Sequence, residues 1–269
     1  MYLSKELTLR DVTIHPGESS LKECRGITAE HCRFEGKYVF WENDGVVCRD
    51  CYFAPSARSS VWYSRNITYI DCLVDAPKMF RRAHGILLEN VKIPHGEETF
   101  WDCSNIRLRN VEIAEADYLF MHSHDIDIED YRQDGNYSFQ YAKNVVIRNA
   151  LLNSKDSFWE SENCTIIDSE INGEYLGWYS ANLHLVRCRI TGTQPLCYCR
   201  NLILEDCTFG DDADLAFEYS SVEATVLNHV KSIKNPTTGH ITLPSVGELI
   251  LDGNAKAPAD CVVKLVGNH

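Results

Sequence analysis

The chain has 269 residues, of which 44% are apolar, and its formal net charge is −13. This acidic balance argues against a nucleic-acid backbone or an anionic membrane as the main partner, because both need a basic footprint. No apolar run approaches the roughly 20 residues of a membrane span, and the start at Met1 shows no apolar signal region. We therefore expect a cytoplasmic protein that binds neither nucleic acid nor membrane.

A short template recurs along the chain at intervals of 19 to 21 residues. Each copy has a small or polar residue, an apolar alternation, then Asn or Asp, then a small residue. An early copy begins near Leu7 and a degenerate one near Val222. The clear copies between them begin at Gly26, Gly45, Asn66, Gly85, Asn105, Asp125, Asn144, Asn163, Asn182 and Asn201. Period-two alternation is typical of strands, and this short period leaves no room for a crossover helix.

The repeat predicts one all-β domain over residues 1–269, a single-stranded right-handed parallel β-helix of about 11–12 coils. Stacking of these coils would bury one continuous core. We expect regular coils over residues 6–221, and irregular coils with a cap over 222–269. The segment Glu248-Leu-Ile-Leu-Asp is predicted to be the last strand.

Stacking turns equivalent positions into columns. One column consists of Asn and Asp, which tolerate a left-handed backbone and cap turns, so it is interpreted as a structural turn ladder. The next column holds small residues, among them Cys32, Cys51, Cys72, Cys188 and Cys207, which we interpret as buried thiols. No pair of cysteines has a second pair at zinc-finger spacing, and we predict neither a metal site nor a cofactor.

The last strand of each coil carries an aromatic pattern. An apolar column is expected to point inward, and it contains Phe40, Val61, Phe80, Phe100, Phe120, Phe139, Phe158, Leu196 and Phe217. The two columns that follow contain charges, so we expect the strand to end between them and both to reach solvent. Exposed aromatic residues at this density favour a binding surface, with an oligomer interface or plain packing as the alternatives.

All five tryptophans lie in the first of these two columns and five tyrosines in the second. The predicted ligand-binding residues are Trp41, Glu42, Trp62, Tyr63, Trp101, Gln140, Tyr141, Trp159, Glu160, Trp178, Tyr179, Tyr198, Glu218 and Tyr219. The expected ligand is a carbohydrate or another small polar molecule.

Successive coils also bring Arg81 and Arg82, then Asp102, then His122 to the middle of this face. Side chains one coil apart lie about 5 Å apart, so these four are the candidate catalytic residues that could hold an anionic group and move a proton. A surface ion-pair network is the competing account. Adjacent coils supply no carboxylate pair at the spacing of about 5 to 9.5 Å that glycoside hydrolysis needs.

Six segments carry a resemblance to known proteins over essentially the whole chain. They are His15-Pro-Gly-Glu-Ser, Ala76-Pro-Lys-Met-Phe-Arg-Arg, Tyr118-Leu-Phe-Met-His-Ser, Gly173-Glu-Tyr-Leu-Gly-Trp, Gly192-Thr-Gln-Pro-Leu-Cys-Tyr and Phe217-Glu-Tyr-Ser-Ser. The chain resembles an uncharacterised bacterial family, a domain of unknown function, within the pectin-lyase-like β-helix superfamily. That resemblance implies the fold, and the superfamily contains polysaccharide lyases, hydrolases, esterases and isomerases that use a groove along the helix.

The leading hypothesis is therefore a protein that binds or processes a carbohydrate along this aromatic face, with a polysaccharide lyase or glycoside hydrolase as the enzyme class if it is one. The alternative is a non-catalytic scaffold or oligomerisation module, a homo-oligomer whose aromatic face is a protein interface.

Overall fold

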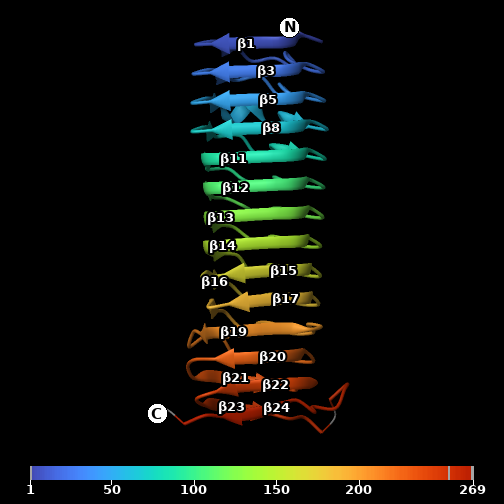
Figure 1. Cartoon of the computed structure of the whole chain (residues 1–269), viewed down its shortest axis with the longest axis vertical. Helices are drawn as coiled ribbons and strands as arrows, with labels where there is room; N and C mark the ends of the chain where they lie inside the picture. Colours follow the sequence, from blue (N-terminus) through green and yellow to red (C-terminus); the bar gives the residue numbers. More distant parts are fainter. Residues whose placement is uncertain (1, 254, 268–269) are drawn as a thin grey trace. The chain divides into compact units, whose positions relative to one another are not determined.

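A computed structural model describes residues 2–253 and 255–267 of the chain. It is an all-β parallel solenoid with about 14 turns and one short 3-10 helix among the described residues. The chain divides into two compact units, Met1–Gly135 and Asn136–His269, and each is described by itself. Within each unit the long strands stack one above the next (Figure 1).

The first unit contains seven coils, and most of its strands are short because each coil turns several times. They are β1 (Lys5–Arg10), β2 (Thr13–Ile14), β3 (Arg25–Glu30), β4 (Arg33–Phe34), β5 (Asp44–Arg49), β6 (Tyr52–Phe53), β7 (Val61–Trp62), β8 (Arg65–Ile70), β9 (Leu73–Val74), β10 (Phe80–Arg81), β11 (His84–Ile93), β12 (Ser104–Ile113) and β13 (His124–Asp134), with the 3-10 helix Pro55–Ala57 after β6. The first strands of successive coils, β1, β3, β5, β8, β11, β12 and β13, pair in parallel.

The second unit also contains seven coils. Its strands are β14 (Lys143–Asn153), β15 (Glu162–Ile167), β16 (Glu170–Asn172), β17 (Ala181–Val186), β18 (Arg189–Thr191), β19 (Leu202–Phe209), β20 (Ser221–Val226), β21 (Val230–Lys234), β22 (Thr238–Leu243), β23 (Val246–Ile250) and β24 (Val262–Leu265). Here β14, β15, β17, β19, β20, β22 and β24 pair in parallel.

The solenoid has more coils than the repeat predicts, about 14 instead of 11–12. Strand β20 pairs with β22, and β22 with β24, so coils are stacked well beyond Ser221. These last coils have lost the repeat in sequence but keep its backbone pairing, which explains why the sequence indicates only 11–12 coils. The expected strand at Glu248 is present as part of β23 and is followed by β24.

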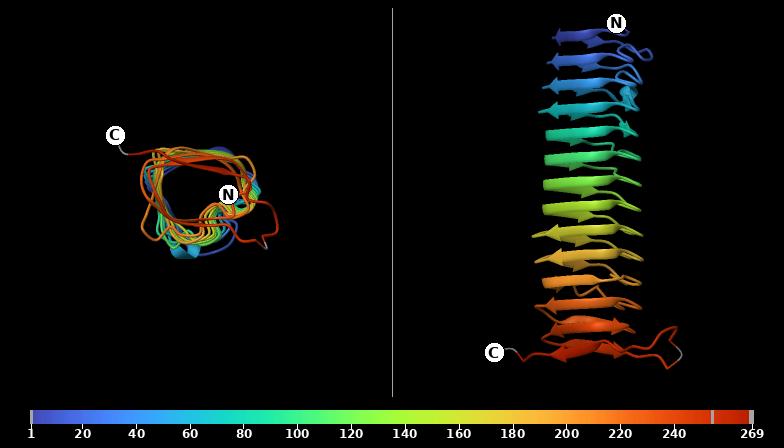
Figure 2. Two further views of the ribbon diagram at one scale, coloured as in Figure 1. Left: turned by 90° about the horizontal axis from the view of Figure 1, so that it is seen from below. Right: turned by 45° about the vertical axis from the view of Figure 1, so that its right-hand side comes forward.

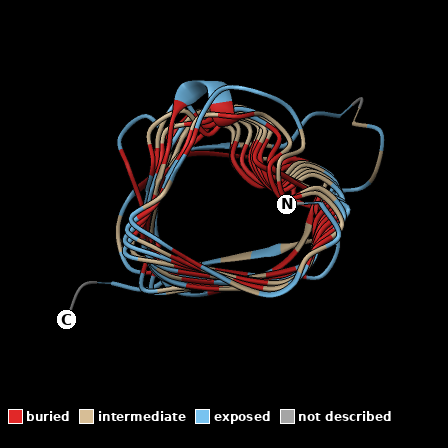
Figure 3. Cartoon of the chain, turned by 90° about the horizontal axis from the view of Figure 1, so that it is seen from above, coloured by how far each residue is buried: buried red, intermediate tan, exposed pale blue. Residues whose placement is uncertain are grey.

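The core of each unit is made by the inward positions of the strands (Figure 3). All nine residues of the predicted apolar column, from Phe40 to Phe217, have no solvent exposure. In the first unit Phe100 stacks on Phe80 at 4.8 Å and on Phe120 at 4.7 Å between ring centroids. In the second unit Phe139 stacks on Phe158 at 4.7 Å. The inward aromatic stack is confirmed.

Corners are made by residues in the left-handed conformation, and viewed along the coils the backbone follows closed loops (Figure 2). The Asn/Asp column provides one corner, with φ of 53° at Asp71 and 52° at Asn110. The Asn90 amide donates a hydrogen bond to the Asp71 carboxylate (2.9 Å), and the Asn110 amide donates one to Asn90 (2.8 Å). The predicted turn ladder is therefore confirmed in its geometry.

Candidate functional site

A second corner places the two aromatic columns on the surface. The tryptophans are half-buried, whereas the following residues, such as Tyr63, Asp102 and Tyr179, have φ between 52° and 60° and are exposed. The left-handed turn swings these side chains outward and interrupts the strict alternation of a strand. Both columns therefore reach the surface in most coils, as the charges in them predict, whereas Glu218 is buried. The residue that follows is buried and in most of these coils small, for example Ser64 and Cys199, with Asn43 as a larger exception.

The tryptophans are packed more tightly than a free binding platform would be. In the first unit, the rings of Trp41 and Trp62 lie 5.6 Å apart, and both contact Tyr38 at 5.0 and 5.9 Å. The indole N–H of Trp62 donates to the carbonyl of Lys78 (3.0 Å), and that of Trp101 donates to the carbonyl of Tyr118 (2.5 Å). These contacts tie one coil to the next, so the tryptophans of this unit have a structural role.

Arg81 is the most enclosed of the four candidate catalytic residues. Its guanidinium lies between the rings of Trp62 and Trp101, at 4.8 and 4.4 Å from their centroids, and pairs with Glu98 at 3.3 Å. A cation between two indole faces is held by both ring quadrupoles. Arg81 is therefore engaged by the protein itself rather than presented to a ligand.

The other three candidates, Arg82, Asp102 and His122, lie side by side but loosely. Asp102 Oδ2 is 3.8 Å from Arg82 Nε, and Asp102 Oδ1 is 3.5 Å from His122 Nδ1. Their side chains are 60%, 43% and 54% exposed, respectively. Water screens charges at this exposure, and such pairs contribute about 0–1 kcal/mol each. The geometry matches the surface ion-pair network better than a preorganised catalytic centre.

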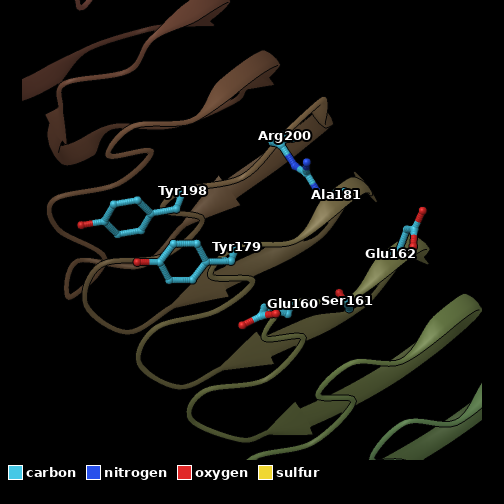
Figure 4. Close-up of a pocket in the computed structure, with 7 residues that line it drawn as sticks. All are labelled: Glu160, Ser161, Glu162, Tyr179, Ala181, Tyr198 and Arg200. Carbon is cyan, nitrogen blue, oxygen red and sulfur yellow. The ribbon is translucent and has the colours of Figure 1, made fainter. Parts of the chain in front are cut away.

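The second unit contains a hollow of about 400 Å³ beside the same corner. Its lining residues are Glu160, Ser161, Glu162, Tyr179, Ala181, Tyr198 and Arg200 (Figure 4). The hollow runs across three coils, because Glu162, Ala181 and Arg200 are register partners on adjacent coils. Ala181 has the smallest side chain of the three, which leaves room above it between Glu162 and Arg200.

Two tyrosines form one wall of this hollow. The rings of Tyr179 and Tyr198 stack at 4.7 Å with an angle of 13°, and their hydroxyl groups point the same way (Figure 4). Their outer neighbours, Trp159 and Tyr219, lie at 5.8 and 5.5 Å. Ring faces are thus largely taken by other rings, and the edges and hydroxyl groups remain for a ligand. Burial raises the pKa of Tyr198, so its phenol stays a hydrogen-bond donor at neutral pH.

The carboxylate of Glu160 lies at the end of this row of rings. It accepts a hydrogen bond from the indole N–H of Trp159 at 3.3 Å, just as Glu42 in the first unit accepts one from Trp41 at 3.2 Å. The neighbouring Trp178 instead donates to the carbonyl of Gln194 (2.8 Å). The Trp–Glu pair therefore orients a surface carboxylate in each unit.

A second hollow of about 320 Å³ lies next to the first, lined by Tyr137, Gln140, Tyr141, Asp156 and Trp159. Burial raises the pKa of Asp156 above its ordinary value. Trp159 borders this hollow and its sequence neighbour Glu160 lines the larger one, so the two hollows lie close to each other.

The structure thus separates the predicted residues into groups. The two hollows bring together Gln140, Tyr141, Trp159, Glu160, Tyr179 and Tyr198. Two other predicted residues are engaged elsewhere: buried Glu218 pairs with Lys234 at 2.9 Å, and Tyr219 Oη accepts a hydrogen bond from the Lys256 amide. The sequence prediction missed Arg200, Glu162, Asp156 and Tyr137. A signal for the first two exists, since they stand two residues after the exposed corner residue in their coils.

In the described part of the chain, no three His, Cys, Asp or Glu side chains are grouped so as to hold a metal ion. Among the same residues, no helix is long and apolar enough to cross a membrane.

Fold and surface together define a parallel β-solenoid protein whose second unit carries a hollow lined by tyrosines, carboxylates and an arginine. The chain belongs to the family described as "Protein of unknown function (DUF3737)", whose model matches residues 1–264. The expected membership of an uncharacterised family is confirmed, whereas the link to the pectin-lyase-like superfamily stays a prediction.

Similar solved structures are distant. PfbA, a surface adhesin of Streptococcus pneumoniae, is 7% identical over 94% of this chain and 85% of its own, with a TM-score of 0.38. QnrB1, a plasmid-mediated fluoroquinolone resistance protein, is 16% identical over 69% and 82%, with a TM-score of 0.26. HetL, a pentapeptide repeat protein of the cyanobacterium Nostoc, is 10% identical over 82% and 86%, with a TM-score of 0.21. No curated protein matches the chain.

Proposed function

We propose that this protein binds a carbohydrate in the hollow lined by Glu160, Tyr179, Tyr198 and Arg200. One observation carries this proposal: a concave site of about 400 Å³ combines carboxylate acceptors, a guanidinium donor and phenol groups on three adjacent coils. Specific small-molecule sites fall in the range of about 300–1,000 Å³ and place a few polar groups among aromatic walls.

The chemistry of these groups suits a ligand rich in hydroxyl groups. Carboxylate oxygens of Glu160 accept hydrogen bonds from sugar hydroxyls, and the guanidinium of Arg200 donates to sugar oxygens, often in pairs. The edges of Tyr179 and Tyr198 cover the C–H surface of a sugar ring and exclude water from it. The adjoining hollow at Tyr141 and Asp156 offers a second subsite, which favours an oligosaccharide over a single sugar.

Binding is favoured over catalysis. The candidate catalytic residues Arg82, Asp102 and His122 are exposed and more than 3.4 Å apart. Catalytic groups act on developing charge most effectively where water is excluded and their positions are fixed. Neither condition holds at this cluster, so we do not assign it a catalytic role. We assign the hollow of the second unit a role in recognition.

A glycan array with the full chain tests this proposal first, followed by calorimetry on the best ligand with an Ala181→Arg variant. Arginine at this register position is compatible with the fold, because Arg65 and Arg200 occupy equivalent positions in other coils. The added side chain fills the floor of the hollow. We expect Kd to rise by at least tenfold, a change of about 1.4 kcal/mol.

Ser104→Arg is the matched control, since Ser104 stands at the equivalent position in the first unit. It is expected to bind like the wild type. Equal binding by wild type and Ala181→Arg, or no binding to any glycan, would refute the proposal. In the latter case, sedimentation of wild type beside Tyr63→Ala would test the alternative of an aromatic protein interface.

A further inference from the structure

A column of thiols lies in the first unit, away from the proposed binding site. Cys32, Cys51 and Cys72 occupy the same position on three successive coils, and none forms a disulfide in the structure. Their following residues are register partners, Arg33 with Tyr52 and Tyr52 with Leu73. In-register residues of adjacent parallel strands lie about 4.8 Å apart, within the Cα separation of about 4.4–6.8 Å that a disulfide needs.

Cys51 is the cysteine of this column whose pKa is lowered. Hydrogen bonds from the side chains of Cys48 and Cys72 lower the pKa of Cys51. The same contact with Cys51 raises the pKa of Cys72, while burial raises that of Cys48. The backbone N–H of Cys32 also points at the Cys51 sulfur, 3.4 Å away. A sulfur that receives several donors is stabilised as the thiolate, the nucleophilic form.

A buried phenol beside these thiols provides an independent observation. Tyr69 has no solvent exposure, and in the described part of the chain its hydroxyl has no hydrogen-bond partner. Burial raises the pKa of this phenol, and Cys48, Cys72 and Cys51 are near enough to raise it further. A buried donor without a partner destabilises the fold. An oxygen atom added to one of these sulfurs would therefore accept a hydrogen bond from the Tyr69 hydroxyl.

We propose that Cys51 is a peroxide-reactive thiol and that Cys72 resolves it into a disulfide joining two adjacent coils. The Cys51 sulfur attacks one oxygen of hydrogen peroxide, the O–O bond breaks, and the leaving hydroxide takes the Cys51 proton as water. The Cys72 sulfur then attacks the sulfur of the sulfenic acid, the S–O bond breaks, and the hydroxide leaves with the Cys72 proton. Two thiols are oxidised to one disulfide and one peroxide is reduced to two waters.

The exposure of Cys51 and Cys72 is small but not zero. Cys51 and Cys72 each retain 3% exposure, whereas Cys103, a buried cysteine whose neighbours in the column are Ala83 and Ser123, has none. Burial raises the pKa of Cys103 to about 12. Cys103 is therefore an internal reference: its sulfur also accepts a backbone hydrogen bond, from the Ala83 N–H at 3.5 Å, but it lacks the neighbouring thiols.

The second unit repeats the arrangement with less access. Cys188 and Cys207 stand on adjacent coils, one residue before the register partners Arg189 and Thr208. A hydrogen bond from Cys188 lowers the pKa of Cys207. Their exposure is 1% and 0%, so this pair should form the same disulfide more slowly.

The test treats the folded full chain with hydrogen peroxide, blocks the remaining thiols, and maps disulfides by mass spectrometry without reduction. We expect a Cys51–Cys72 link and loss of free Cys51 at least about tenfold faster than of Cys103. Cys51→Ser should abolish the link, and Cys72→Ser should leave a Cys51 sulfenic acid that dimedone traps. Serine is tolerated in this column, because Ser169 occupies it in the second unit.

Tyr69→Phe keeps the ring and removes the orphan donor, so it should slow Cys51 oxidation without changing that of Cys103. Oxidation of Cys51 no faster than of Cys103, a link from Cys51 to Cys48 instead of Cys72, or a reaction that needs denaturant would each overturn the proposal.

Discussion

The buried phenol of Tyr69 gives the sharpest stability prediction. Its ring stacks on Phe53 at 4.9 Å inside the core, and its hydroxyl finds no partner among the described residues. A buried donor without a partner costs about 1–3 kcal/mol. Tyr69→Phe removes that cost and gives up only the few dispersion contacts of one oxygen, each about 0.1–0.2 kcal/mol. We expect the free energy of unfolding to rise by about 1–2 kcal/mol.

Tyr131→Phe is the matched control in the same unit. Tyr131 is also buried, but its hydroxyl donates to the side-chain oxygen of Gln133 at 3.0 Å. Removing this donor takes a partner from a buried amide and should lower the free energy of unfolding by about 1 kcal/mol. The two changes delete the same atom and are expected to act with opposite sign.

Urea denaturation followed by circular dichroism measures both variants. At an unchanged slope, the midpoint should move up for Tyr69→Phe and down for Tyr131→Phe. In thermal unfolding, a change of 1 kcal/mol corresponds to about 2–4 °C for a chain of this size. If Tyr69→Phe destabilises the protein as much as Tyr131→Phe, the Tyr69 hydroxyl has a partner and the reasoning is wrong.

Two further outcomes are expected in the first unit. Phe100→Ala opens a cavity in a stack of rings spaced 4.7–4.8 Å apart and should lower the free energy of unfolding by about 3–5 kcal/mol. The same urea midpoints measure this loss, and a loss under about 1 kcal/mol would contradict tight packing there. His95 lies between Glu115 and Asp75, and its hydrogen bond to Glu115 raises its pKa, so the folded state holds this proton to higher pH than the unfolded state. That stabilisation is complete below the ordinary pKa of about 6.5 and is lost as pH rises through the folded pKa. The urea midpoint of wild type should therefore fall more between about pH 6 and 8 than that of His95→Gln. Midpoints that change in parallel would contradict the ion pair of His95 with Glu115.

Much of the fold could be predicted from the sequence because the repeat is a direct record of coil stacking. Phe100 and Asn110 recur in the next coil as Phe120 and Asp130, and their columns behave as expected. The coils after Ser221 were expected to be irregular, but their number was underestimated, since backbone pairing between β20, β22 and β24 needs no side-chain repeat. Hydrogen bonding along the backbone keeps the register after the pattern is lost.

The site was less predictable, because it depends on contacts between columns and between coils, which the pattern within one column does not show. The sequence pattern of an aromatic column does not reveal that the indole of Trp101 is hydrogen-bonded to a neighbouring coil. Nor does it reveal that Arg81 lies between two indole rings. The hollow exists because the small Ala181 lies between Glu162 and Arg200, a relation among three coils. Glu218 is paired by Lys234, which lies outside the repeat.

The most direct measurement of the proposed function is a crystal structure of the protein with the glycan that binds best on the array. The account predicts a sugar ring in the hollow of the second unit, with its oxygens about 2.7–3.2 Å from the Glu160 carboxylate or the Arg200 guanidinium, against the edges of Tyr179 and Tyr198. A glycan ordered on any other surface, with this hollow holding only water, would contradict it.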